Sequence, residues 1–160
     1  MNRCIMALIV TTALLAGCQT AKQTEAGETG LEQVPVFISG EDGYHTYRIP
    51  AVIATTQGTL LAFCEGRKNS RSDHGNLDLV LKRSADGGLT WGPMQVVYEE
   101  GGDAEITIGN PCPVLDRRNG RVWLPFCRDN DDVLVTWSDD DGKTWADPVE
   151  ITSAVKEAGW

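Results

Sequence analysis

An eight-residue motif occurs twice in the chain and constrains its fold more than any other feature. Both copies follow the pattern S-x-D-x-G-x-T-W, and they start at Ser84 and Ser138, 54 residues apart. Each copy stands between two short apolar runs typical of β-strands, so we expect each motif to form a hairpin turn. Ser and Asp side chains bond nearby backbone N–H groups in such turns, Gly supplies a positive φ, and Trp covers the hairpin with apolar area. The residues assigned to the two turns are Ser84, Asp86, Gly88, Thr90 and Trp91 in the first copy and Ser138, Asp140, Gly142, Thr144 and Trp145 in the second.

The repeat also extends upstream of the turns. A segment containing proline is followed in both copies by an apolar run that begins after a glycine. Each copy is therefore expected to contain four strands, and four-stranded units repeated along a chain are the blades of a β-propeller. The four predicted strands of the first copy begin near residues 48, 59, 77 and 94, and those of the second begin near residues 110, 121, 133 and 148.

Composition agrees with an all-β fold and excludes one class of partner. The 17 glycines and five tryptophans, with short apolar runs between turn residues, favour many short strands. The formal net charge of -9 argues against nucleic acid as a partner, because binding it requires a basic face that displaces counterions from phosphate. An anionic ligand would need a local cluster of arginines acting against the overall charge.

The two copies differ in one loop. The glycines that open the second strands, Gly58 and Gly120, are 62 residues apart, whereas the turns are 54 apart. The first copy thus has eight extra residues between its second and third strands, and they fall within residues 67–75. A propeller turn has no structural need of this charged loop, and long irregular loops on a rigid scaffold usually carry function.

These motifs together resemble the sialidase family. The resemblance rests on Tyr47-Arg48-Ile49-Pro50, on Glu65-Gly66-Arg67, on Asp73 in the loop beyond, and on the two turns, which are of the Asp-box type. It covers residues 35–160 and implies a six-bladed β-propeller of which about the first two blades are present. In this family the Asp boxes lie on the rim away from the active site, which implies that the ten turn residues named above are structural.

The resemblance also implies roles for individual residues. Arg48 matches the first of three arginines that hold the carboxylate of sialic acid, a task suited to a guanidinium that binds carboxylates bidentately and stays charged. Asp73 matches the general acid and base; Asp78 is the alternative, although the run around it alternates like a strand. Arg67 and Asn110 match positions near the 4-hydroxyl of the sugar, but an ion pair at Arg67 and a turn at Asn110 explain them equally well.

Other catalytic groups of the family have no counterpart in the chain. The tyrosine nucleophile, its glutamate partner and two more arginines are expected beyond the region it covers. We therefore expect the N-terminal piece of a retaining exo-α-sialidase acting on sialylated glycans, with an incomplete site. The alternatives are a non-catalytic carbohydrate-binding propeller with Asp boxes, and a relative that acts on another acidic sugar or transfers sialic acid.

The N-terminal residues have the pattern of an export signal. Arg3 precedes an apolar run at residues 5–15 that is too short to span a bilayer, and Leu15-Ala16-Gly17-Cys18 resembles the lipobox of bacterial lipoproteins. We predict a signal peptide at residues 1–17, lipidation of Cys18, a flexible tether over residues 18–34, and a protein anchored to the membrane in the periplasm or at the cell surface. The alternative is an ordinary signal peptide with an incidental cysteine.

Neither a disulfide framework nor a metal site is expected. Cys64, Cys112 and Cys127 form an odd set, and Cys64 and Cys127 lie in apolar runs where buried, inert thiols are expected. His45 and His74 are too few for a zinc site. The run Asp139–Gly142 has no glutamate at the twelfth position of a calcium loop, which disfavours that alternative. No cofactor is predicted.

Overall fold

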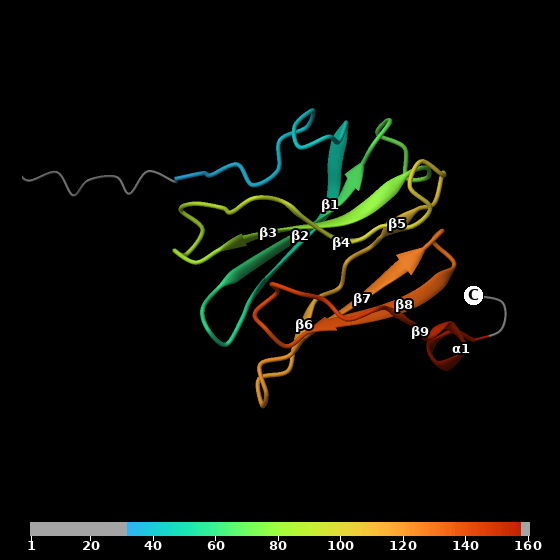
Figure 1. Cartoon of the computed structure of the whole chain (residues 1–160). Helices are drawn as coiled ribbons and strands as arrows, with labels where there is room; N and C mark the ends of the chain where they lie inside the picture. The colour runs from blue at the N-terminus through green and yellow to red at the C-terminus, as the bar shows by residue number, and fades with distance from the viewer. Residues whose placement is uncertain (1–31, 158–160) are drawn as a thin grey trace, which may run out of the picture. The chain divides into compact units, whose positions relative to one another are not determined.

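Residues 32–157 are described by the computed structural model, in which two antiparallel β-sheets follow each other along the chain (Figure 1). The all-β prediction is confirmed, and the first predicted unit is a four-stranded sheet; the second sheet has five strands, because its predicted first strand is divided into two. The first sheet has the order β1 (Thr46–Ala54), β2 (Leu60–Arg67), β3 (Leu77–Ser84) and β4 (Gln95–Tyr98). The second contains β5 (Ile108–Gly109) and β6 (Val114–Leu115), both paired with β7 (Val122–Arg128), then β8 (Asp132–Ser138) and β9 (Val149–Glu150). A short helix, α1 (Thr152–Val155), follows; no helix in the described range is long and apolar enough to cross a membrane.

The predictions for the signal peptide and for Cys18 lie outside the described residues.

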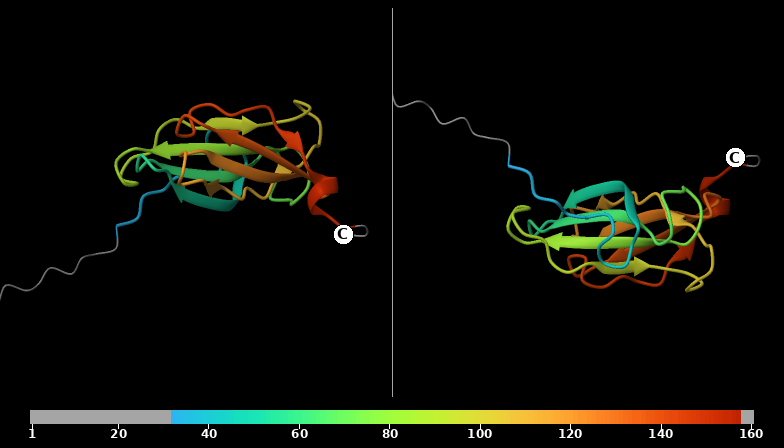
Figure 2. Two further views of the ribbon diagram at one scale, coloured as in Figure 1. Left: turned by 90° about the horizontal axis from the view of Figure 1, so that it is seen from below. Right: turned by 90° about the horizontal axis from the view of Figure 1, so that it is seen from above.

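The main core lies between the two sheets, which Figure 2 shows stacked face to face. Because side chains alternate across a strand, every second residue of β2 faces the second sheet. Leu61 and Phe63 contribute to the core in this way, whereas Cys64 packs on the other face with Tyr44 and Val80. The fully buried members of the main core are Leu61, Phe63, Leu79, Leu81, Ile108, Val122, Leu124 and Phe126.

The first strand of the second unit departs from the prediction of one continuous strand. It is interrupted between β5 and β6, because Asn110 has a left-handed backbone (φ 56°) and the prolines at 111 and 113 have no N–H to donate. The matching place in β1 has only one proline and is bridged by a β-bulge between Arg48 and Ala51, where Ile49 has φ 55°. A left-handed residue thus produces a bulge within one strand in the first unit and a break between two strands in the second.

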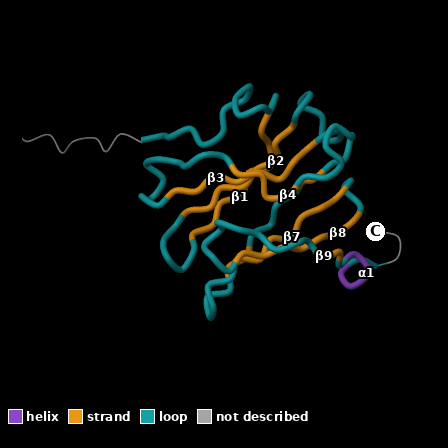
Figure 3. The backbone as a smooth tube through the Cα atoms, viewed as in Figure 1, coloured by secondary structure: helices purple, strands orange, loops and turns teal. Residues whose placement is uncertain are grey.

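The long loop of the first unit has the predicted place. Nine residues, 68–76, connect β2 and β3, whereas three residues, 129–131, connect β7 and β8 (Figure 3). The first hairpin also has one more residue pair, Arg67 opposite Leu77, beyond the pair that matches Arg128 and Asp132. The longer loop and this extra pair together account for the eight additional residues.

Both Asp boxes form closed hydrogen-bond networks at the ends of the sheets opposite to the long loop. Asp140 accepts hydrogen bonds from Ser138 Oγ at 2.8 Å, from Thr144 N at 2.9 Å and from Thr144 Oγ1 at 2.6 Å, and Asp86 repeats these contacts with Ser84 and Thr90. The neighbouring Asp139 and Asp141 instead pair with Arg121 and Arg83. Within residues 32–157 no group of His, Cys, Asp and Glu side chains is arranged to hold a metal ion.

The tryptophan of the second Asp box, Trp145, contacts the first sheet. Trp145 packs edge-on against Phe63 of the first sheet, with ring centroids 5.6 Å apart, and borders the core between the sheets. The contact with the first sheet was not predicted. Because Phe63 belongs to the other unit, this tryptophan helps to hold the two units together.

The cysteines also depart in part from prediction. Cys64 is buried, as expected, but Cys127 is only half-buried and Cys112 is exposed; all three are free. Burial raises the pKa of the Cys64 thiol to about 12, so this thiol is protonated at physiological pH.

The hydrogen bonds within the Asp boxes predict an acid-sensitive stability. The pKa of Asp140 is lowered to about 2, because hydrogen bonds from Thr144 and Ser138 to the carboxylate outweigh the opposing effect of burial. This stabilisation is complete above the unfolded-state pKa of about 4 and is lost as pH falls through about 2. Asp140→Asn should therefore lower the thermal midpoint near pH 6 and flatten its fall between pH 5 and 2. Asp147→Asn, at an exposed position of the same hairpin, is the control, and equal slopes in wild type and Asp140→Asn would contradict the prediction.

Apolar side chains remain exposed on the outer strands. Val52 of β1, Val114 of β6 and Val149 of β9 are all exposed, as is Val96 of β4. In a closed ring of blades such positions face neighbouring units, and open blade edges favour pairing between chains. The exposed valines agree with a partial propeller.

Candidate active site

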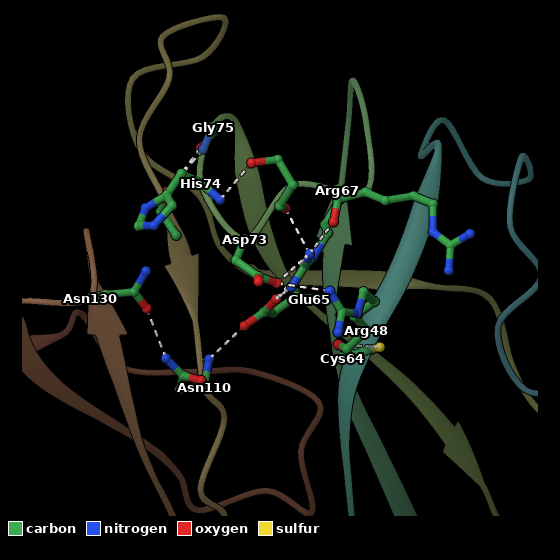
Figure 4. Close-up of polar contacts among 12 residues, drawn as sticks. Arg48, Cys64, Glu65, Arg67, Asp73, His74, Gly75, Asn110 and Asn130 are labelled. Carbon is green, nitrogen blue, oxygen red and sulfur yellow. Dashed lines mark hydrogen bonds and ion pairs between the residues drawn. The ribbon is translucent and has the colours of Figure 1, made fainter.

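Three charged residues lie at the loop end of the first sheet because of strand alternation and register. Glu65 and Arg67 are two residues apart on β2, so they continue the face that Leu61 and Phe63 turn toward the second sheet. Arg48 of β1 stands directly opposite Glu65 in the register. The long loop closes over this end and adds Asp73 (Figure 4).

Arg67 is buried and holds the long loop. Its guanidinium Nε and Nη2 donate to Glu65 Oε2 at 3.1 and 2.6 Å, and Nη1 donates to the backbone carbonyls of Arg71 and Ser72, each at 2.7 Å. Burial disfavours the charged form, but the hydrogen bonds to Glu65 and Asp73 outweigh it and raise the pKa of Arg67. Both structural and ligand-binding roles were open for this residue, and the structure shows an ion pair that anchors the loop.

Asp73 stands in the loop between two guanidinium groups. Its Oδ1 lies 2.9 Å from Arg48 Nη1 and 2.8 Å from Arg67 Nη1, while the side chain is 67% exposed. The hydrogen bond from Arg67 and the charge of Arg48 lower the pKa of the Asp73 carboxyl. Among the described residues Oδ2 has no hydrogen-bond partner, so this oxygen is accessible to a ligand.

Arg48 has N–H groups without a hydrogen-bond partner among the described residues. Its side chain is 44% exposed and, within the described part of the chain, donates only through Nη1 to Asp73. Its backbone sits at the β-bulge beside Ile49, a β-branched residue in the left-handed region, which such residues rarely occupy. The thiol of Cys64 donates to the Arg48 carbonyl at 2.9 Å. The bulge therefore directs an arginine with free N–H groups toward solvent beside Asp73.

Asn110 connects the second sheet to this site. Its backbone N–H donates to Glu65 Oε1 at 3.1 Å, and its side-chain Nδ2 donates to Asn130 Oδ1 at 3.0 Å. The side chain is exposed at the same end of the sheets as Arg48. All four predicted residues, Arg48, Arg67, Asp73 and Asn110, thus contribute to one cluster.

The surroundings of Asp78 distinguish it from Asp73. Asp78 is buried on β3, where it accepts a hydrogen bond from Tyr44 Oη at 2.6 Å and pairs with Lys68 Nζ at 3.2 Å. Burial and the contact with Asp78 raise the pKa of Tyr44. A carboxylate enclosed in this way is not accessible to a ligand, whereas the Asp73 side chain is exposed.

Sequence reasoning assigned no role to Glu65. The residue was noted only as part of a motif, yet it contacts Arg67 and Asn110 and is 4% exposed. One signal was available in the sequence, because Glu65 and Arg67 at i and i+2 of a predicted strand must share a face. Its contact with the second unit had no such signal.

Comparisons with known proteins identify similar sequences and structures. The family model described as BNR repeat-like domain matches residues 58–156. The exo-alpha-sialidase of Aspergillus fumigatus is 35% identical over 79% of this chain, and a Bacteroides fragilis sialidase is 31% identical over 83% of it. The chain belongs to the sialidase family. The solved structure of the Hadza microbial sialidase Hz136 overlays on 76% of the chain with a TM-score of 0.70 at 28% identity.

The sialidase relatives are much longer than the matched region. The chain spans 38% of the Aspergillus protein, 30% of the Bacteroides protein and 29% of the Hz136 structure. The two sheets therefore correspond to part of a sialidase propeller, and the cluster around Asp73 lies within that part.

Proposed function

We propose that the chain supplies the first part of the active site of an exo-α-sialidase that removes terminal sialic acid from glycoconjugates. The observation that carries this proposal is the pairing of an exposed aspartate, Asp73, with Arg48, whose remaining N–H groups are free among the described residues. A carboxylate-binding arginine beside a proton donor suits a sugar acid. The sialidase relatives support the same class of reaction.

In this proposal Arg48 binds the carboxylate of the sugar and Asp73 protonates the glycosidic oxygen as the C–O bond breaks. The geometry supplies a reason for the proton to be available. In the free site, Arg48 lowers the pKa of Asp73, but a bound sialic acid carboxylate would neutralise Arg48 and exclude water, and both effects raise that pKa. Asp73 then becomes a better acid when substrate is present.

The remaining chemistry is proposed by family likeness. A tyrosine outside this chain attacks the anomeric carbon, an exception among glycosidases, which mostly use carboxylates. Asp73 then removes a proton from water, which displaces the tyrosine with retention. Because the tyrosine, its glutamate partner and two arginines are expected outside the 160 residues, we expect the chain alone to release no sialic acid. We also expect it to be poorly stable, because two blades without their neighbours leave apolar side chains exposed to water.

Hydrolysis of sialyllactose by the full-length gene product, followed by NMR, tests this function. We expect release of free sialic acid that appears first as the α-anomer, which is the retained configuration. Failure of the full-length product to release sialic acid, or initial release of the β-anomer, would contradict it. Transfer to an added lactose acceptor in place of water would identify the related transferase reaction.

We also propose that the protein is exported and anchored through a lipid on Cys18, on the basis of the lipobox-like run that ends there. Cys18→Ala should move the protein from the membrane fraction to the soluble fraction, because the lipid-bearing thiol is lost. Cys112→Ala, at an exposed cysteine of the folded part, is the control and should stay in the membrane fraction. Mass spectrometry that finds an unmodified mature N-terminus at Gln19 or later would refute the anchor.

A further inference from the structure

Glu65 is a buried carboxylate that touches both sheets. Oε2 accepts two hydrogen bonds from the guanidinium of Arg67, at 3.1 and 2.6 Å, and Oε1 accepts the backbone N–H of Asn110 at 3.1 Å. Both oxygens are therefore used, one by the first sheet and one by the second. The residue itself lies 4% exposed at the end of a face that is otherwise apolar.

The second sheet is shaped to accept this carboxylate. A Cβ atom on Gly109 would clash with Glu65 Oε1, so any other residue at 109 would displace this carboxylate from its present position. Burying a charged group is unfavourable unless it is paired and hydrogen-bonded, and replacing such pairs by apolar residues often increases stability. Leu61 and Phe63 occupy the preceding positions of the same face, so an apolar residue at 65 would continue it. Stability alone therefore does not account for a glutamate here.

A chain of contacts connects Glu65 to Asp73 without direct contact between them. Glu65 fixes Nε and Nη2 of Arg67, which leaves Nη1 directed at the long loop. There Nη1 meets the carbonyls of Arg71 and Ser72 at 2.7 Å and Asp73 Oδ1 at 2.8 Å. Because a guanidinium is planar, fixing one edge fixes the direction of the other.

We propose that Glu65 is a positioning residue, which orients Arg67 so that the long loop places Asp73 beside Arg48 and which couples this placement to the second sheet through Asn110. The proposal deepens the proposed sialidase function and rests on it for its catalytic meaning, but the placement itself can be measured without any substrate.

Removing the charge of Glu65 has a defined effect on Asp73. The titratable groups that face Asp73 are Arg48 from β1, Arg67 from β2 and His74 from its own loop; those near Glu65 are Arg67 and the thiols of Cys64 and Cys127. In Glu65→Gln the guanidinium of Arg67 loses the carboxylate that orients it. The hydrogen bond from Arg67 that lowers the pKa of Asp73 should weaken, so this pKa should rise toward its ordinary value.

The test compares Glu65→Gln with Asp141→Asn by NMR on the full chain. Glutamine keeps the size of glutamate, but its single carbonyl oxygen cannot serve both Arg67 and Asn110. Asp141 is a matched control, because it is also a buried carboxylate that links the second unit to the first, through Thr59 Oγ1 at 2.5 Å and Arg83 Nη2 at 3.1 Å, at the opposite end of the sheets. Both variants weaken contacts between the sheets, but only one is connected to Asp73.

In Glu65→Gln we expect exchange of the Arg67 Nε–H with solvent to accelerate at least about tenfold and Asp73 to titrate at higher pH, with neither change in Asp141→Asn. Titration of Asp73 at lower pH would report only the lost charge of Glu65 and would overturn the positioning role. Unchanged exchange and titration in a folded Glu65→Gln, or equal changes in Asp141→Asn, would overturn the proposal. If Glu65→Gln does not fold, hydrogen exchange is measured in the wild-type protein. The Nε–H of Arg67 should then exchange much more slowly than the Nε–H of the exposed Arg118, and equal rates would overturn the proposal.

Activity of the full-length gene product separates this inference from the proposed function. If it cleaves sialosides, Glu65→Gln should shift the alkaline limb of kcat/KM to higher pH, whereas Asp141→Asn should not. If the expected NMR changes occur but the full-length product is inactive, the positioning role of Glu65 is supported and the proposed sialidase function is refuted. Sialidase activity with unchanged NMR signals in Glu65→Gln would support the proposed function and refute the positioning role of Glu65.

Discussion

Asp73→Ala in the full-length enzyme is expected to lower kcat for natural sialosides by about 10²- to 10⁴-fold, the usual contribution of a general acid. Much of the activity on aryl sialosides should remain, because a phenolate leaving group departs without a proton. The structural reason is the position of Asp73 Oδ2, which is accessible in the loop while Oδ1 is held by Arg48 and Arg67. Steady-state kinetics on sialyllactose and on a nitrophenyl sialoside measure the two losses.

Asp78→Asn is the companion variant for this experiment. It removes a buried carboxylate that contacts Tyr44 and Lys68, so it should lower thermal stability and leave the ratio of the two activities unchanged. Equal losses on both substrates in Asp73→Ala would reject the acid role. A normal Asp73→Ala enzyme together with a leaving-group-dependent Asp78→Asn enzyme would assign the role to Asp78.

Arg48→Ala is expected to lower kcat/KM for sialosides by about 30- to 5000-fold, which corresponds to a loss of about 2–5 kcal/mol for a truncated charge pair. The variant should also shift the alkaline limb of kcat/KM to higher pH. The sign follows because the charge of Arg48 lowers the pKa of Asp73, so its removal keeps the acid protonated to higher pH. Arg48→Lys should recover only part of the loss, since lysine cannot bind a carboxylate bidentately.

Arg118→Ala serves as the control for a lost surface arginine. Arg118 is 90% exposed and pairs with Asp116 in the turn before β7, at the Asp-box end of the second sheet. Its loss should leave both kinetics and pH profile unchanged. An Arg48→Ala enzyme with a normal KM and an unshifted alkaline limb would show that Arg48 does not hold the substrate carboxylate.

Local rules were sufficient to predict the blades from the sequence. The S-x-D-x-G-x-T-W turns depend on hydrogen bonds within seven residues, such as those that Ser138 and Thr144 make to Asp140. The motif alone is therefore enough to predict the turn. The long loop was equally visible, because the comparison of two copies exposes an insertion. Placing Asp73 in that loop and Asp78 on a strand required only the alternation around residue 78.

Contacts between the two units could not be predicted in the same way. Glu65 contacts the Asn110 N–H across 45 positions, and Trp145 packs on Phe63 across an even longer separation. Such pairs depend on how one sheet stacks on the other, which no local pattern in a single sequence specifies. The break between β5 and β6 required the left-handed backbone of Asn110 as well as its neighbouring prolines.

Addition of sialic acid to the isotope-labelled full-length protein tests the central claim most directly, because NMR reports which end of the sheets binds the ligand. The account predicts that signals of Arg48, Asp73 and Asn110 shift, that the pKa of Asp73 rises on binding, and that signals of the Asp-box residues Ser84 and Ser138 stay in place. Shifts centred on the Asp boxes, or saturable binding with no change at Arg48 and Asp73, would contradict it.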